Sequence, residues 1–396
     1  MGLYDEFVYT LPKRYSQWGD TYASPRAYFQ GSESLWNSNL RMGFSVILKE
    51  TLAEYPHFHH SVEEYYLFSG ADLTNFFDFD AEIDIWIGED PKHLERHTIT
   101  KPGIVRIPPN MWHGPIHYRK VKKPVAFSAV HFAGEIAKIT RKVLPDGTVC
   151  YPAFGSMQRR CVYDRTVACT NCGRCVRGYT ENLEDFHHPD LDFAYDWAKE
   201  IVRDRRENAG KYDSLFYEYP QEYHKYGDVY ANPRGKFRGR TQMPDANFYG
   251  GFSVAMKPTD MEVPHIHFAN DEYLWFIGSD LRNVFDFDAE VEVYLGYSPD
   301  DMEKIVITEP TVIRVPPNLW HCPINFKRVG KPVAFFPVYP DGDWSKVVRQ
   351  KNEAGEYEYL FEAASLRRCV YDHEKICNYC GRCLSDPNVK PLGVFV

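Results

Sequence analysis

The chain has 396 residues, enough for two domains that each bury a full hydrophobic core. Hydrophobic residues make up 44% and charged residues 26%, as in ordinary soluble globular proteins. The net charge is −9, and the densest basic run, at 119–123, is short, so the sequence gives little electrostatic basis for binding nucleic acid. No apolar stretch is long enough to span a membrane, and no secretory signal is visible. We therefore expect a cytoplasmic protein without a nucleic-acid or membrane partner.

The sequence repeats itself at a constant offset of 208 positions. Residues from about 9 to 175 recur, so that His57 corresponds to His265. Over residues 103–127 and 311–335, 14 of 25 positions are identical. A purely structural duplication would keep the apolar pattern but has no reason to keep His, Glu and Cys in register. We infer that metal sites were duplicated together with the fold.

Each repeat predicts a series of short β-strands after a Tyr- and Pro-rich arm. The strand-like runs combine alternation, β-branched residues and Gly, Pro, Asn or Asp at their ends, which is typical of antiparallel sandwiches and barrels. The sequence therefore predicts an all-β protein with two similar β-barrels. The runs are 43–50, 63–70, 81–89, 103–109 and 123–132 in the first copy, and 251–258, 271–278, 289–297, 311–317 and 331–340 in the second.

Between the repeats, the sequence predicts one helix. Pro189 stands near its expected start and Gly210 at its expected end, and apolar residues such as Leu191 and Ile201 recur at helical spacing. We interpret this helix as a connector that packs against one or both barrels.

Three histidines and one glutamate form a candidate metal site in each repeat. His57 and His59 have the i, i+2 spacing that places two side chains on one face of a strand. Glu64 follows closely, and His113 comes after a Pro-Pro-Asn turn that can carry it back across the barrel. Such a nitrogen and oxygen set suits Mn, Fe, Co, Ni or Zn in the +2 state. The alternative is that the histidines are buried and hydrogen-bonded without metal. The second copy has His265, His267, Glu272 and His321 at the same spacing.

At these residues the sequence resembles the cupin superfamily. His-x-His-x4-Glu-x5-Gly is similar to the first cupin motif, and Pro-Pro-Asn-x-Trp-His is similar to the second. The resemblance covers most of both repeats, so it implies a bicupin with two jelly-roll barrels, and it implies that the eight residues above bind metal. It also makes a homo-oligomer an expectation. The predicted boundaries are barrel 1 at 1–160, a four-cysteine motif at 161–177, a helical linker at 178–214, barrel 2 at 215–368, and a second four-cysteine motif with the tail at 369–396.

Each repeat ends in four cysteines with the spacing C-x7-C-x2-C-x2-C. Clustered cysteines in a cytosolic protein more often bind metal than form disulfides. Three cysteines within seven residues resemble the bacterial ferredoxin run, which favours a [4Fe–4S] cluster. The fourth cysteine lies upstream, however, and a zinc site with four thiolates is the main alternative, with free or redox-switching thiols as the third. The residues are Cys161, Cys169, Cys172 and Cys175, and Cys369, Cys377, Cys380 and Cys383.

Two arginines are candidates for contacts with substrate. Arg106 and Arg314 precede the second motif and could hold a substrate carboxylate, although a structural salt bridge is the favoured interpretation.

The sequence supports three hypotheses of function. The first is a metalloenzyme that acts on a small oxygenated organic molecule, with the metal as a Lewis acid and a nearby side chain moving the proton, as in a lyase, decarboxylase, isomerase or hydrolase. The second is an Fe(II)-dependent ring-cleaving dioxygenase. The third is a non-catalytic ligand, redox or metal sensor. Bicupins of this layout include oxalate decarboxylases and ring-cleaving dioxygenases, and fold analogy does not choose among them.

Overall fold

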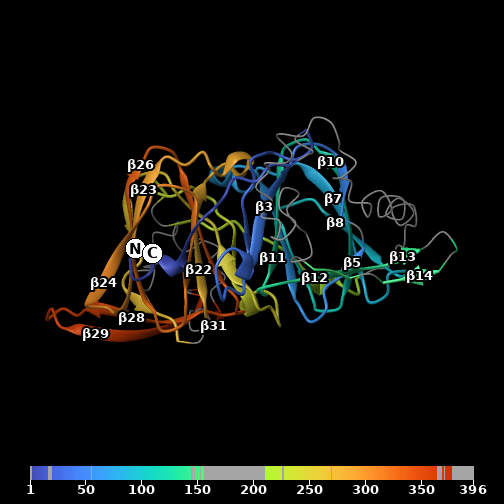
Figure 1. Cartoon of the computed structure of the whole chain (residues 1–396). Helices are drawn as coiled ribbons and strands as arrows, with labels where there is room; N and C mark the ends of the chain where they lie inside the picture. Colours follow the sequence, from blue (N-terminus) through green and yellow to red (C-terminus); the bar gives the residue numbers. More distant parts are fainter. Residues whose placement is uncertain are drawn as a thin grey trace. The chain divides into compact units, whose positions relative to one another are not determined.

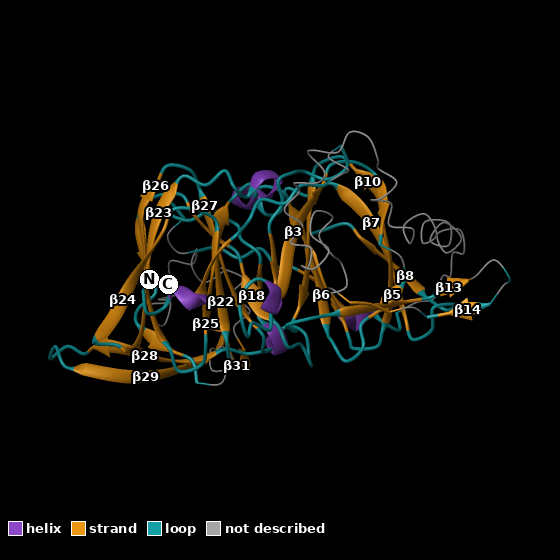
Figure 2. Ribbon diagram, in the orientation of Figure 1, coloured by secondary structure: helices purple, strands orange, loops and turns teal. Residues whose placement is uncertain are grey.

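The computed structural model describes residues 2–16, 20–54, 56–143, 146, 148–151, 153–155, 210–224, 227–268, 270–363, 368–369 and 371–376. These residues form two compact units. Barrel 1 consists of residues 12–71 and 78–218, and barrel 2 of residues 1–11, 72–77 and 219–396, as far as each range is described. Figure 2 shows that strands dominate both units. The helical segments of the described residues are short 3-10 turns: η1 (Asp5–Phe7), η2 (Gly31–Glu33), η3 (Leu73–Asn75), η6 (Asp213–Leu215), η7 (Gly239–Thr241) and η8 (Leu281–Asn283).

Barrel 1 is a sandwich of two antiparallel sheets, several strands of which are labelled in Figure 1. The first sheet has the order β16 (Phe216–Glu218), β9 (Gly103–Ile107), β6 (Glu64–Gly70), β11 (Val125–His131), β3 (Arg41–Ile47) and β2 (Tyr28–Gln30). The second has the order β15 (Ala153–Gly155), β12 (Ala137–Thr140), β5 (His57–Phe58), β10 (Trp112–Val121), β7 (Ala81–Gly88) and β8 (Glu95–Ile99), with β4 (Thr51–Ala53) also on β10. A separate pair joins β13 (Lys142–Val143) and β14 (Val149–Cys150).

Barrel 2 repeats this arrangement. Its first sheet has the order β1 (Val8–Thr10), β25 (Thr311–Val315), β22 (Glu272–Gly278), β27 (Val333–Tyr339), β18 (Tyr249–Gly251) and β17 (Lys236–Phe237), with β19 (Ser253–Ala255) also on β27. Its second has the order β24 (Asp301–Ile307), β23 (Ala289–Ser298), β26 (Trp320–Val329), β21 (His265–Ile266), β28 (Ser345–Lys351) and β29 (Tyr357–Ala363), with β20 (Thr259–Met261) also on β26. A further pair joins β30 (Arg368–Cys369) and β31 (Asp372–Ile376).

The strands with alternating sequences direct one set of apolar side chains into the core, as their sequence predicts, although the other face of β7 is also covered, with Asp84 and Trp86 each 2% exposed. Along β7, Ile83, Ile85 and Ile87 are fully buried in the core between the two sheets of barrel 1. Glu82, which precedes Ile83, is partly exposed and pairs with Lys120. The predicted all-β fold with two duplicated sandwiches is therefore confirmed.

The first sheet of each barrel is completed by a short strand that belongs, by sequence, to the other repeat. In barrel 2, β1 pairs with β25, with Tyr9 opposite Val312. In barrel 1, β16 pairs with β9, with Tyr217 opposite Ile104. The two added strands are themselves related by the 208-residue offset, so the repeats have exchanged their first strands.

This exchange changes the domain boundaries expected from the sequence. The sequence assigned residues 1–160 to barrel 1 and began barrel 2 at residue 215. In the structure, residues 1–11 and 72–77 belong to barrel 2, whereas residues up to 218 belong to barrel 1. The segment 72–77 is held in barrel 2 by the hydrogen bond from Leu73 N to Ser279 O, at 2.9 Å. A linear repeat pattern does not show which sheet a short terminal strand joins.

Two predicted features lie outside the described residues. The linker helix at 178–214 is one, except for residues 210–214, which form a bend at Gly210 and the start of η6 rather than an α-helix. The four-cysteine motifs are the other, apart from the backbone of Cys369 in β30. What the cysteines bind stays a prediction. In the part of the chain that the structure describes, no helix has the length and apolar character needed to cross a membrane.

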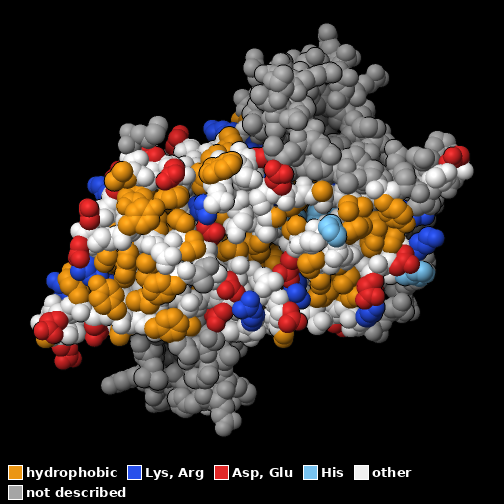
Figure 3. All heavy atoms as spheres, turned by 60° about the horizontal axis from the view of Figure 1, so that its bottom comes forward, with side chains coloured by type: hydrophobic (Ala, Val, Ile, Leu, Met, Phe, Trp, Pro, Cys, Tyr) orange, Lys and Arg blue, Asp and Glu red, His pale blue; other side chains and the backbone are white. Residues whose placement is uncertain are grey.

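The surface drawn in Figure 3 carries acidic and basic side chains interspersed with apolar ones. On that face, the described residues form no continuous basic area of the kind that tracks a phosphate backbone.

The strand exchange predicts that one tyrosine near each exchanged strand stabilises the barrel built mainly from the other repeat. Tyr4 is buried in the core of barrel 2, and Tyr212, its equivalent 208 positions later, is buried in the core of barrel 1. Replacing either by alanine should cost roughly 3 kcal/mol of local stability through lost packing. We expect Tyr4→Ala to speed hydrogen–deuterium exchange in β25 but not in β9, and Tyr212→Ala to do the reverse. A variant that loosens both strands equally would contradict the exchange.

Candidate metal centres

The four predicted ligands of each repeat meet between the two sheets of its barrel. In barrel 1, the two-residue strand β5 places His57 directly opposite His113 of β10. Glu64 opens β6 of the facing sheet. In barrel 2, His265 lies opposite His321 in the same way. One ligand atom from each member of a set lies within 4.8 Å of the others: His57, His59, Glu64 and His113 in barrel 1, and His265, His267, Glu272 and His321 in barrel 2.

The predicted turn before the fourth ligand is present in both copies. Asn110 and Asn318 have left-handed φ angles of 65° and 66°, which asparagine adopts more readily than most residues. The backbone N–H of Asn110 donates to the carbonyl of His59 at 3.0 Å, and that of Asn318 to the carbonyl of His267 at 2.7 Å. The turn therefore fastens the end of β5 or β21 to the start of the strand that carries the fourth ligand.

Backbone carbonyls fix the orientation of most ligand imidazoles. In barrel 1, Nδ1 of His59 lies 2.9 Å from the carbonyl of Ala137, and Nδ1 of His113 lies 2.9 Å from the carbonyl of Met111. A carbonyl only accepts, so each Nδ1 carries a proton, and in a neutral ring the Nε2 lone pair then points inward. The same contacts in barrel 2 join His265 to Val263 at 2.7 Å, His267 to Ser345 at 2.6 Å and His321 to Leu319 at 3.2 Å.

The inward atoms fit a divalent cation. Nε2 of His113 lies 2.9 Å from Oε2 of Glu64, and Nε2 of His321 lies 2.8 Å from Oε2 of Glu272. All four atoms are buried, and none has a hydrogen bond of acceptable geometry despite this proximity. With Nδ1 protonated, a neutral imidazole directs a lone pair at a carboxylate lone pair, which is unfavourable unless a cation lies between them. The geometry supports the proposal that both sets bind metal.

Burial and charge hold these groups in the protonation states that a metal site needs. Burial lowers the pKa of His57 and of His265 well below 6.5, so both imidazoles are neutral at neutral pH. Burial alone would raise the pKa of Glu64, but the charges that His131 and His59 carry when protonated outweigh it and hold that pKa well below 4.5. Glu272 is held low in the same manner by His267 and His321.

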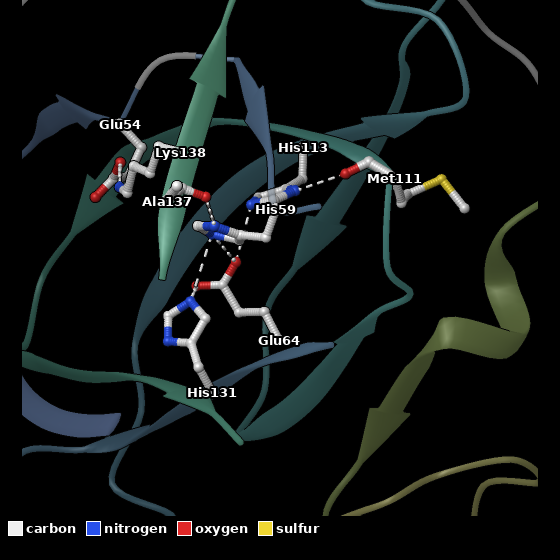
Figure 4. A network of polar contacts seen from close by, with 8 residues as sticks. All are labelled: Glu54, His59, Glu64, Met111, His113, His131, Ala137 and Lys138. Atoms are coloured by element: carbon white, nitrogen blue, oxygen red, sulfur yellow. Dashed lines mark hydrogen bonds and ion pairs between the residues drawn. The ribbon is translucent and has the colours of Figure 1, made fainter. Parts of the chain in front are cut away.

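A fourth histidine distinguishes the centre of barrel 1. Nε2 of His131 lies 2.8 Å from Oε1 of Glu64, the carboxylate oxygen that the other histidines do not contact, as Figure 4 shows. In barrel 2 the equivalent residue is Tyr339, whose ring packs edge-on against His267. The sequence analysis did not identify either residue. The signal lies in the strand register, because β11 places His131 opposite Glu64, and register is not visible in a single sequence.

The surroundings of the two centres also differ in polarity. Tyr66 and Tyr118 are fully buried in the core of barrel 1, where barrel 2 has Leu274 and Phe326 at the equivalent positions. The ring of Tyr66 packs edge-on against His113, with centroids 5.8 Å apart. Barrel 1 therefore surrounds its ligands with more hydrogen-bonding side chains than barrel 2.

The candidate arginines lie on the opposite face of the sheet. Ile107 pairs with Glu64 and faces the core, so the adjacent Arg106 faces away from the ligands. Its guanidinium forms a salt bridge with Glu63. Arg314 likewise pairs with Asp271, at 2.7 Å. These contacts favour the structural interpretation of both arginines, and no contact of either with the ligand sets appears among the described residues.

Comparisons with known proteins found similarity to solved structures alone. No protein-family model matches the sequence, and no curated protein matches it either. A tryptophan-to-phenylalanine variant of oxalate decarboxylase from Bacillus subtilis matches with a TM-score of 0.47 and 12% identity, over 86% of this chain and 79% of that chain. The same enzyme, described for its Mn(II) centres, matches with a TM-score of 0.47 and 11% identity over the same shares. The enzyme at pH 4.6 matches with a TM-score of 0.46 and 11% identity, over 86% of this chain and 78% of that chain. An identity this low does not assign an activity.

The ligand geometry predicts that each barrel binds its metal independently. Replacing His57 and His59 by alanine should remove about half of the transition metal bound outside the cysteine motifs, because two of four ligands are lost in one barrel. Replacing His265 and His267 should remove the other half. Elemental analysis of the purified variants checks this, with Arg106→Gln as a control that should leave the metal content unchanged. Equal metal content in both double variants and in the unaltered protein would contradict the assignment.

The buried histidines predict how the metal-free protein responds to acid. His57 and His265 have lower pKa values in the folded state than the ordinary 6.5, so the unfolded chain takes up their protons first as the pH falls. Stability should therefore be full above about pH 6.5 and decline below it, by up to roughly 1.4 kcal/mol per pH unit for each group. Urea unfolding of chelator-treated protein at about pH 7.5 and 5.5 measures this slope. The slope should be smaller in a variant with glutamine at both positions, and an unchanged slope would contradict the prediction.

Proposed function

We propose that this chain is a metal-dependent enzyme of the bicupin type that acts on a small oxygenated organic molecule. The observation that supports this proposal is the presence of two complete three-histidine, one-glutamate sets whose inward atoms are buried and directed at one another. A ligand set of this kind leaves coordination positions for substrate or water. A divalent ion bound there acts as a Lewis acid toward a carboxylate, enolate or hydroxy-keto group.

The residues of this chain supply orientation and proton transfer. The Nδ1 contacts hold the imidazoles in place before any substrate arrives, which avoids a cost of reorganisation. In barrel 1, His131 contacts Oε1 of Glu64, and the phenol of Tyr66 also hydrogen-bonds to that carboxylate. Burial raises the pKa of Tyr66 well above 10, so the phenol keeps its proton and acts as a donor. We propose Mn, Fe, Co, Ni or Zn as the metal in these sites.

The test is turnover by the metal-loaded protein with small hydroxy and keto acids, in the presence and absence of oxygen. We expect turnover without oxygen, and loss of turnover in the variant that lacks His57 and His59. Oxygen uptake with a catechol-like substrate would assign the dioxygenase function instead. Tight binding of such molecules without turnover would assign the sensor function.

The same preparation, purified without oxygen, decides what the cysteine motifs hold. We propose [4Fe–4S] clusters, which would give a brown protein with iron and sulfide in similar amounts. A colourless protein with tightly bound zinc and no sulfide would assign zinc instead.

A further inference from the structure

Each barrel contains a lysine–glutamate ion pair beside its metal centre, outside the four-ligand set. In barrel 1, Lys138 pairs with Glu54, and in barrel 2 Nζ of Lys346 lies 2.7 Å from Oε2 of Glu262. The 208-residue offset relates the two pairs. The neighbours of the lysines differ between the copies, with Ala137 and Ile139 in one and Ser345 and Val347 in the other. Both charged residues of the pair were thus retained while the residues around them changed.

The lysine of barrel 1 points to the same face as the ligands. Thr140 of β12 lies opposite His57 of β5, and residues opposite one another in a ladder point to the same side of the sheet. Lys138 is two residues before Thr140 and shares that face. Figure 4 shows Lys138 and Glu54 beside the ligands, with the adjacent Ala137 accepting from His59. After burial, the charge of Lys138 is the largest contribution that lowers the pKa of His57.

The glutamate of each pair has a strained backbone. Glu54 and Glu262 have left-handed φ angles of 56° and 62°. This conformation is unfavourable for a residue with a side chain, and such strain is concentrated at functional sites. The charge of Glu54 also affects a nearby phenol of barrel 1, that of Tyr22. Burial first, and Glu54 second, raise the pKa of the Tyr22 phenol to about 12.

The two lysines differ in the groups that surround them. A second carboxylate, Glu362, lies 3.9 Å from Nζ of Lys346, and the ring of Trp344 lies 5.5 Å from it. In barrel 1, Phe154 has the register position of Glu362, opposite Lys138, so the second carboxylate is lost there. The side chain of Lys138 is 29% exposed, compared with 12% for Lys346. The lysine side chain of barrel 1 is therefore the more exposed of the two.

We propose that Lys138 binds the carboxylate group of a small hydroxy- or keto-carboxylate substrate in barrel 1, and that Lys346 has a structural role in barrel 2. This inference rests on the proposed function and names its substrate class and its barrel. Glu54 pairs with the ammonium group when no substrate is bound and competes with the substrate carboxylate for it. The additional polar residues of barrel 1, which are His131, Tyr66 and Tyr118, suit an oxygen-rich ligand better than Tyr339, Leu274 and Phe326 of barrel 2.

The experiment measures binding of glycolate to the full-length, manganese-loaded protein by calorimetry, with glycolamide as the uncharged comparator. Both molecules can chelate a metal through two oxygens, but glycolate alone carries the charge that Lys138 would contact. We expect Lys138→Met to weaken glycolate binding about tenfold, the value of one charge-assisted hydrogen bond, and to leave glycolamide binding unchanged. Lys138→Arg should retain most of the glycolate affinity, and Lys346→Met should leave binding to barrel 1 unchanged.

A second variant separates a substrate-binding role from a merely structural ion pair. Glu54→Gln removes the competing carboxylate, so it should strengthen glycolate binding, whereas a structural pair would weaken it when either partner is lost. Lys123→Met, which breaks an exposed pair with Asp78, is the matched control and should change nothing. Equal effects of Lys138→Met on glycolate and glycolamide, or weaker glycolate binding in Glu54→Gln, would overturn the proposal.

Metal analysis of every variant keeps this proposal separate from the proposed function. If the unaltered protein binds no metal in its barrels, the proposed function fails first. If metal binds and glycolate affinity is the same with and without Lys138, the proposal for Lys138 alone is wrong.

Discussion

Both centres depend on one electrostatic constraint, which is that a buried carboxylate faces three buried imidazoles, most of which bind a backbone carbonyl through Nδ1. The constraint arises because backbone carbonyls take the Nδ1 protons, which leaves each Nε2 lone pair directed at the glutamate. The ligand side chains are buried between the two sheets, so bulk solvent compensates these groups poorly. A divalent cation would compensate them, because neutral imidazoles and an ionised carboxylate are the ligands that it needs. The rest of each barrel serves to hold these atoms in this arrangement.

The elements that meet this constraint are short and local. A two-residue strand, a Pro-Pro-Asn turn and the first residue of a longer strand carry each ligand set. The main-chain contacts of these elements do not depend on which side chains fill the rest of the core. This explains how the copies keep all eight ligands while neighbouring positions change from Tyr66 to Leu274 or from His131 to Tyr339. The duplication therefore produced two centres with one ligand set and two different surroundings.

The sequence predicted the ligand sets and the sheet class because both are encoded locally. Spacing of two residues in a strand and alternation along β7 or β23 report the face of a side chain directly. The sequence missed His131, Tyr339 and the two lysine–glutamate pairs because their proximity to the centres depends on strand register across the barrel. It named Arg106 and Arg314 as candidates for substrate contacts but favoured a structural salt bridge, and the pairing of Ile107 with Glu64, which turns Arg106 away from the ligands, agrees with the favoured interpretation. The sequence also did not show the strand exchange. Each exchanged strand has only three residues, and such a short segment does not indicate which sheet it joins.

The strand exchange links the two halves of the sequence at the metal ligands themselves. In barrel 1, the exchanged β16 pairs with β9, and β9 pairs with β6, where Ile107 lies opposite the ligand Glu64. In barrel 2, β1, β25 and β22 connect Tyr9 to Glu272 through the same two steps. The outer edge of β9 or β25 would present unpaired backbone groups without its exchanged partner, which loosens an edge strand. Neither repeat therefore contains every strand that supports its own carboxylate ligand. This arrangement accounts for the retention of both repeats in one chain, because loss of either repeat would remove a strand from the barrel of the other.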